Sequence, residues 1–106
     1  MAHAIVDSAS LEGRRKLIAQ ELGARAIRLN RFDSRPGQEG FAHDERESGQ
    51  EEIYFAVEGE GMIRVGSEET PLEPARFVLV SADETRQVIA GPRGLSYVVV
   101  GAVVVD

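Results

Sequence analysis

An alternating run at residues 52–58 limits the possible folds of this chain more than any other feature of the sequence. Ile53, Phe55 and Val57 occupy one set of alternate positions, and the other set is Glu52, Tyr54, Ala56 and Glu58. Side chains point to opposite faces of a β-strand in turn, so this pattern predicts a strand with one strongly apolar face. A helix would scatter the same residues around its circumference.

Further short apolar segments follow this run at spacings near ten residues. Strands are expected at residues 62–65, 76–80, 86–90 and 95–105, the last bent or bulged at Gly101, with turns at 59–61, 66–69, 81–84 and 91–94. Glycine and proline in the intervening segments favour hairpin turns. Such a series of short strands is typical of a β-barrel or a β-sandwich.

The segment before these strands has a different pattern. Apolar residues at near-helical spacing predict a short helix over residues 11–22, followed by Gly23 as a left-handed C-terminal cap, although Gly13 disfavours helix near its start. Residues 24–32 predict a strand with one solvent-facing side. Residues 36–51 are polar and aperiodic, which indicates a long loop, and loops of this length are often functional.

The length of the chain is sufficient for one domain and too short for two, at 106 residues. We expect a single barrel domain over residues 1–106, with an N-terminal helical segment at 1–23 and the barrel at 24–106. The absence of cysteine excludes disulfides and thiolate chemistry. The start has no signal-peptide pattern, and the longest apolar stretch, residues 97–105, is about half of a membrane span. We therefore expect a cytoplasmic protein that does not bind membranes.

The charge of the chain disfavours nucleic acid as a partner. The formal net charge is −6. Residues 14–35 carry seven bases and two acids, whereas residues 39–52 carry six acids and one base. A nucleic-acid interface needs a basic surface with aromatic platforms, and here the whole chain is acidic and lacks tryptophan.

Residues 36–61 resemble the first motif of the cupin family. Pro36-Gly37 precedes His43, and the seven-residue interval from Glu52 to Gly59 matches the spacing of the glutamate and glycine in that motif. Residues 72–80 look like the start of the second cupin motif. The resemblance covers about residues 24–105. It implies an all-β fold, a small double-stranded β-helix (jelly-roll) barrel with a short N-terminal helix.

The resemblance also implies a possible metal site, with departures from the family pattern. Metal-binding cupins use two histidines and a glutamate from the first motif and one histidine from the second. Here those first three positions fall on His43, Glu45 and Glu52, with Glu47 as a substitute in another loop register. In the second motif Arg86 stands near the place of the histidine, and a guanidinium cannot become a ligand.

Each of these residues also has a structural interpretation. His43 in a polar loop is most simply a solvated side chain. Glu52 shares its strand face with Tyr54, so if that face lines the barrel the carboxylate is buried and needs a counter-charge. Arg86 is the natural partner, and a Glu52–Arg86 ion pair would replace the metal. Tyr54 offers a hydroxyl to a ligand, or is an aromatic of the barrel wall with its polar end satisfied.

These observations leave three classes of function. The leading interpretation is a small barrel that binds a small organic, acidic ligand through Glu52, Tyr54 and Arg86, without a firmly held metal and with no other cofactor implied. The alternative implied by the resemblance is a metal-dependent enzyme of the dioxygenase, isomerase or decarboxylase type, with a divalent transition metal on His43, Glu45 and Glu52. The third is a non-catalytic module that binds another protein.

A further expectation concerns association. On the strand at residues 52–58, the face pointing away from the barrel is too apolar to remain exposed on so small a domain. Either the N-terminal helix or a second subunit is expected to cover it. A twofold homodimer is the commonest closed arrangement.

Overall fold

The computed structural model describes residues 3–105, so the first two residues and the last of the expected domain lie outside the described residues. Six strands and two short helical segments are present in this part of the chain. In chain order these are the 3-10 helix η1 (Ser8–Ser10), β1 (Arg15–Lys16), α1 (Ile18–Leu22), β2 (Arg28–Ser34), β3 (Gln50–Val65), β4 (Glu68–Leu72), β5 (Phe77–Val80) and β6 (Arg86–Val103). The expected all-β class with a short N-terminal helix is confirmed.

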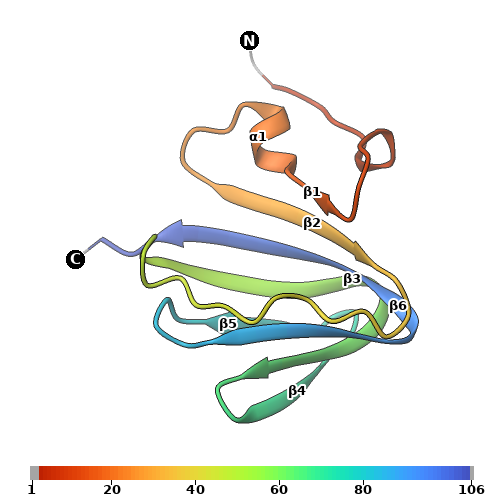
Figure 1. Ribbon diagram of the computed structural model, residues 1–106. Coiled ribbons are helices and arrows are strands. Elements are labelled where there is room, and N and C mark those ends of the chain that lie inside the picture. Colours follow the sequence, from red (N-terminus) through yellow and green to blue (C-terminus); the bar gives the residue numbers. More distant parts are fainter. Residues whose placement is uncertain (1–2, 106) are drawn as a thin grey trace.

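Two long strands, β3 and β6, organise the molecule (Figure 1). They pair antiparallel along most of their length, with register shifts near residues 57 and 60. The first half of β3 and the second half of β6 lie between β2 and β5, while their other halves continue to β4. The register shifts are β-bulges, which increase local twist and bend the paired strands. The two long strands thereby contribute to both sides of the barrel.

Two of the predicted turns are wrong because the two long strands continue through them. Residues 59–61 and 91–94 do not reverse the chain but lie within β3 and β6. Gly59 has φ 76°, and a Cβ there would lie 2.2 Å from the carbonyl oxygen of Gly94. These glycines therefore permit a bend and a close approach of two backbones, a role that sequence alone does not distinguish from a turn.

The prediction of a bulge or bend at Gly101 is also not supported, because the pairing of β6 with β2 and β3 shows no register shift there. A Cβ at residue 101 would lie 2.8 Å from Oε1 of Gln50 and 3.3 Å from Cγ of Glu52. The absence of a side chain at Gly101 leaves room for these two side chains. The predicted strand at 95–105 ends at Val103.

The N-terminal segment is less helical than predicted. Gly13, with φ 85°, precedes β1, which pairs with residues 31–32 of β2, so that α1 covers only Ile18–Leu22. Gly23 caps this helix in the left-handed conformation, at φ 76°, as expected. The next strand begins at Arg28 rather than at residue 24. Strand pairing thus replaced the first turns of the predicted helix.

The predicted loop before β3 is attached to the barrel. Isolated bridges join Glu39 to Ile89 and His43 to Arg86, so residues 39–43 run beside the first half of β6. His43 and Arg86 exchange two backbone hydrogen bonds, of 3.0 and 2.8 Å. The position of His43 is therefore determined by strand-like pairing.

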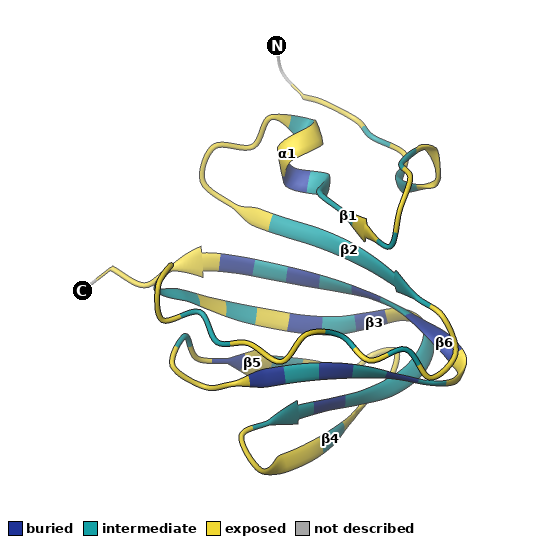
Figure 2. Ribbon diagram, viewed as in Figure 1, coloured by how far each residue is buried: buried dark blue, intermediate teal, exposed yellow. Residues whose placement is uncertain are grey.

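The barrel core lies on the predicted inner face of β3. Tyr54 and Ala56 are buried, and the rest of the core comes from the other strands: Ile63, Leu72, Val80, Val88, Ala90, Leu95, Tyr97 and Val99. Figure 2 shows buried positions alternating with more exposed ones along β3 and β6. The alternation predicted from the sequence is confirmed for residues 52–56.

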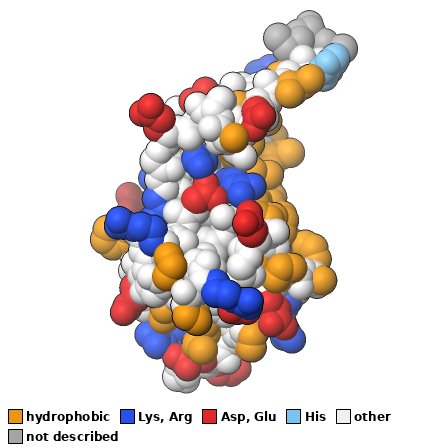
Figure 3. Space-filling model, turned by 90° about the vertical axis from the view of Figure 1, so that its right-hand side faces the viewer, with side chains coloured by type: hydrophobic (Ala, Val, Ile, Leu, Met, Phe, Trp, Pro, Cys, Tyr) orange, Lys and Arg blue, Asp and Glu red, His pale blue; other side chains and the backbone are white. Residues whose placement is uncertain are grey.

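The opposite face of this sheet is apolar and uncovered by the described residues. Ile53 and Val57 of β3 are 40% and 43% exposed, and Phe77 and Leu79 of β5 are 66% and 62% exposed. α1 packs against β2 and contributes to the lining of the inner cavity, so the helix does not cover this face as one alternative expected. On the side of the molecule drawn in Figure 3, hydrophobic side chains gather along one edge beside mixed charges. Among residues 3–105, no helix is long and apolar enough to cross a membrane.

Candidate functional site

A cavity of about 830 Å³ opens into the barrel. Its wall is built from the inward faces of β2, β3 and β6, from residues 40–45 and from α1. Three aromatic rings line one part: Phe32 stacks on Tyr97 with ring centroids 5.0 Å apart, and Tyr97 faces Tyr54 at 6.3 Å. This volume lies within the range of small-molecule sites, about 300–1,000 Å³.

Strand register brings the candidate polar residues to one region of this cavity. Glu52 of β3 is paired with Gly101 of β6, and Arg86 begins β6 opposite His43. All of these residues line the cavity. Glu52 and Arg86 are more than 30 positions apart in the sequence, yet their charged atoms lie close together in the barrel.

Arg86 is fully buried and incompletely paired. Its Nη2 donates a hydrogen bond of 2.8 Å to the backbone oxygen of Ser81. Its Nη1 lies 3.7 Å from Oε1 of Glu52. The predicted Glu52–Arg86 ion pair is thus present, but it is too long for a direct hydrogen bond. Nε and Nη1 of Arg86 have no hydrogen-bond partner among residues 3–105.

Glu52 is held by its neighbour on the same strand face. The hydroxyl of Tyr54 donates a hydrogen bond of 2.9 Å to Oε1 of Glu52. Burial raises the pKa of Tyr54, and the nearby charge of Glu52 raises it further. The hydroxyl therefore keeps its proton and acts as a donor. A direct role of Tyr54 in ligand binding stays a prediction, because its proton is directed to Glu52.

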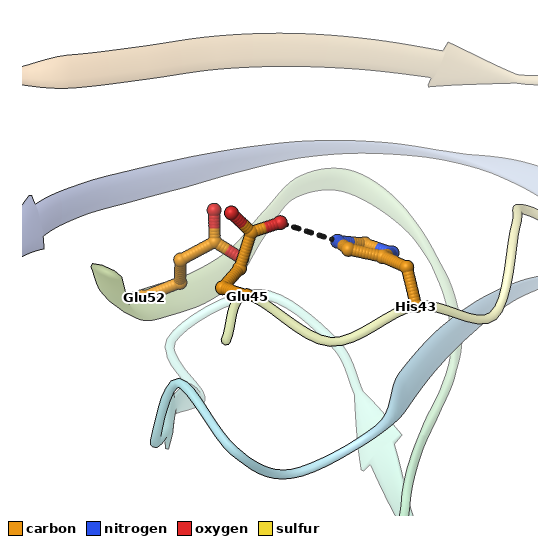
Figure 4. A group of neighbouring side chains, drawn as sticks. All are labelled: His43, Glu45 and Glu52. Carbon is orange, nitrogen blue, oxygen red and sulfur yellow. Dashed lines mark ion pairs between the residues drawn. The ribbon is translucent and has the colours of Figure 1, made fainter. Parts of the chain in front are cut away.

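His43, Glu45 and Glu52 form a compact group, with one possible ligand atom from each lying within 4.8 Å of the others (Figure 4). Nε2 of His43 lies 3.1 Å from Oε2 of Glu45. The hydroxyl of Ser48 donates to Oε1 of Glu45 at 2.7 Å. Glu47, the substitute considered from the sequence, is not part of a metal-compatible group in the described chain.

This group fits a metal ion only in part. Two atoms bound to one ion at about 2.1 Å can be at most about 4.2 Å apart, so the three side chains would have to move slightly closer. One imidazole and two carboxylates suit Mn or Fe. However, the guanidinium of Arg86 lies beside Glu52, where its permanent charge would repel a cation. The three candidate ligand atoms lie close together, whereas Arg86, near the expected position of the fourth ligand, would repel a metal ion.

Two further cavity residues were not singled out from the sequence. Tyr97 is buried, and burial raises the pKa of its hydroxyl, while Arg14 lowers it. The alternation along residues 95–100 would have placed Tyr97 inside. The guanidinium of Arg14 lies 5.2 Å from the centre of the Phe32 ring, in a cation–π contact. Nothing local in the sequence marks Arg14, because strand pairing at β1 brings it there.

Comparisons with known proteins agree with this architecture. No protein-family model and no curated protein sequence matches the chain. A cupin protein from Bacteroides fragilis is 19% identical, with a TM-score of 0.81 over 96% of this chain and 86% of that one. A predicted oxalate decarboxylase from Thermotoga maritima is 17% identical, with a TM-score of 0.76 over 94% of this chain and 99% of that one.

A conserved protein from Klebsiella pneumoniae with a double-stranded β-helix domain is also similar. It is 18% identical, with a TM-score of 0.66 over 88% of this chain and 71% of that one. Identities this low establish the fold and leave the activity open. The strand order, the two long strands that contribute to both sides of the barrel, and these structural neighbours together show that the chain has the cupin fold.

Proposed function

We propose that this protein binds a small organic acid in its barrel, with the carboxylate on Arg86 and without a firmly held metal. One observation carries the proposal: a fully buried guanidinium in the cavity wall has two donor nitrogens, Nε and Nη1, with no hydrogen-bond partner in the described chain. A carboxylate is the natural complement, because its two oxygens match the fork of guanidinium donors.

The energetics of burial support this assignment. A buried donor without a partner costs about 1–3 kcal/mol, and more when the group is charged. Glu52 offsets the charge of Arg86 only in part, because the two groups are 3.7 Å apart. Arg14 and Arg28 also line the cavity, so cationic groups occur at several points of its wall. An anion that meets Nε and Nη1 of Arg86 removes the unsatisfied donors.

Access to Arg86 requires a small rearrangement. The side chain of Arg86 has no exposed surface, whereas that of Glu52 is 13% exposed. We infer that a small shift of the Glu52 side chain, which stays beside the guanidinium, opens Nη1 to a ligand. The ligand carboxylate then takes a place next to Glu52 on the same guanidinium.

The test compares three probes of one size by calorimetric titration: propionate, propanol and propylammonium. Saturable binding is expected for propionate alone. Arg86→Met should abolish it, while the matched surface variant Arg93→Met should retain it, since Arg93 pairs with Glu60 outside this cavity. Propionate binding that survives Arg86→Met, or a preference for the cation, would contradict the proposal.

A second candidate, a metal-dependent enzyme, is favoured by the convergence of three possible ligands. His43, Glu45 and Glu52 would hold the ion, which would supply a Lewis acid for substrate oxygens. One structural neighbour is described as a predicted oxalate decarboxylase. Equilibrium dialysis against Mn(II), Ni(II) and Zn(II) separates the candidates: tight stoichiometric binding that His43→Ala abolishes would favour the enzyme. Failure of both acids and metals to bind would favour the protein-interaction module.

A further inference from the structure

We infer that the acid carries a hydrogen-bond donor, a hydroxyl or an ammonium group, on the carbon next to its carboxylate, and that Glu52 accepts this hydrogen bond. The inference rests on the proposed function, because it places the ligand carboxylate on Arg86. It narrows the ligand from organic acids in general to 2-hydroxy and 2-amino acids.

Glu52 has free acceptor capacity. An ionised carboxylate accepts up to about four hydrogen bonds on its two oxygens. Oε1 receives one from Tyr54, and Oε2 receives none from residues 3–105. Glu52 is partly exposed in the cavity region where the ligand would lie. An acceptor of this kind selects for a donor on whatever occupies the site.

The balance of charge leads to the same conclusion. Glu52 and Glu45 bring two carboxylates to the region of Arg86, whose guanidinium is fully buried. A plain carboxylic acid bound to Arg86 adds a further carboxylate beside Glu52, so that these two negative charges share one guanidinium. A hydroxyl adds a donor between the like charges, and an ammonium group adds an opposite charge.

The position of the donor follows from the closeness of the two protein groups. Nη1 of Arg86 and Oε1 of Glu52 are 3.7 Å apart, so a carboxylate on the first group lies immediately beside the second. A substituent on the adjacent carbon stays next to the carboxylate whatever the remainder of the ligand is. A donor farther along the ligand would not be kept beside Glu52 by the position of the carboxylate.

The test titrates three probes that share one carbon skeleton, butyrate, 2-hydroxybutyrate and 2-aminobutyrate, in buffer with a metal chelator. The two substituted acids are expected to bind about tenfold more tightly than butyrate, which corresponds to about 1.4 kcal/mol for one additional hydrogen bond to a charged group. The stronger of the two identifies the donor as a hydroxyl or an ammonium group.

Glu52→Gln provides the matched variant, with Glu60→Gln as its surface control. An amide oxygen still accepts from a hydroxyl but lacks the charge that attracts ammonium. Glu52→Gln should therefore remove the advantage of 2-aminobutyrate, retain part of that of 2-hydroxybutyrate and leave butyrate binding unchanged or tighter. Glu60→Gln should change none of the three affinities.

Two negative results have different meanings. If butyrate binds as tightly as both substituted acids and its binding still depends on Arg86, the α-donor inference is wrong and the proposed function stands. If none of the three acids binds, the proposed function is wrong and the inference falls with it. Equal discrimination by wild type and Glu52→Gln would show that another residue accepts the bond, which also contradicts the inference.

Discussion

Replacing Arg86 by methionine is expected to lower the free energy of unfolding by about 2 kcal/mol, less than the 3–5 kcal/mol typical of a broken buried ion pair. Methionine fills much of the same volume, so the substitution tests the charge and its hydrogen bonds more than the packing. The reduced cost follows from the incomplete pairing of this guanidinium in the barrel.

The magnitude comes from two losses and one gain. The hydrogen bond from Arg86 to Ser81 contributes about 2 kcal/mol, as a charged donor does. Attraction to Glu52 at 3.7 Å contributes about 4 kcal/mol at an effective dielectric constant of about 20. Against these losses, the substitution removes two buried donor nitrogens that have no hydrogen-bond partner among residues 3–105, and whose burial costs about 4 kcal/mol together. The remainder is about 2 kcal/mol.

The assay is urea unfolding of four proteins: wild type, Arg86→Met, Glu52→Gln and the double variant. If the slopes with denaturant are unchanged, the midpoints report stability directly. The double variant should be less destabilised than the sum of the two single variants, because each single variant leaves one buried charge without its partner and the double variant leaves none. Arg93→Met with Glu60→Gln is the control cycle, on an exposed pair that should show coupling near zero.

Additive effects in the Arg86–Glu52 cycle would refute the reasoning, because they would show that the two charges do not interact. A loss of 5 kcal/mol or more in Arg86→Met would refute it differently. It would mean that Nε and Nη1 are well paired in the folded protein, and the argument for an acid ligand would lose its basis.

Four further outcomes are expected. His43→Ala should cost less than about 1 kcal/mol, because its side chain is 44% exposed; a larger loss of thermal stability, matched by adding chelator to the parent protein, would reveal a bound metal. Arg86→His should gain affinity for Ni, Zn or Mn in equilibrium dialysis, and an unchanged affinity would show that the other ligands do not converge on it. We expect a homodimer through the apolar outer sheet face, broken by Phe77→Glu, and light scattering that gives a monomer mass for the wild type at tens of micromolar would contradict this. Burial raises the pKa of Asp33, but hydrogen bonds from Lys16, Ser96 and Arg31 outweigh it and lower this pKa from 3.8 to about 2. The resulting stabilisation of the folded state is present above the unfolded pKa and should fade as the pH drops from about 4 to 2. Asp33→Asn should abolish that part of the acid sensitivity in unfolding curves.

The strand at residues 52–58 illustrates what local sequence determines. Its alternation correctly placed Tyr54 and Ala56 inside the barrel and Ile53 and Val57 outside, because the period of a strand is fixed by backbone geometry. The left-handed cap at Gly23 was predictable for a similar reason, since glycine adopts positive φ without steric cost.

The path of the two long strands was decided only by tertiary structure. A glycine such as Gly59 permits a turn, a bulge or a close contact equally well, and the approach of Gly94 selects among these. The N-terminal helix lost its first turns in the same way, because pairing of Arg15 with Phe32 competed with helix formation. Local propensity gives way when a distant strand offers hydrogen bonds.

For the candidate site, too, the sequence predicted one part and the tertiary structure decided the rest. The sequence identified His43, Glu45, Glu52 and Arg86 through their residue types and their resemblance to cupin motifs, and the pairing of Arg86 with Glu52 through the cost of a buried charge. Sequence could not reveal that the pair is 3.7 Å apart, or that two donor nitrogens of Arg86 have no hydrogen-bond partner in the described part of the chain. Those facts depend on how β3, β5 and β6 pack around one guanidinium, and distances of this kind are set by contacts among residues far apart in the chain.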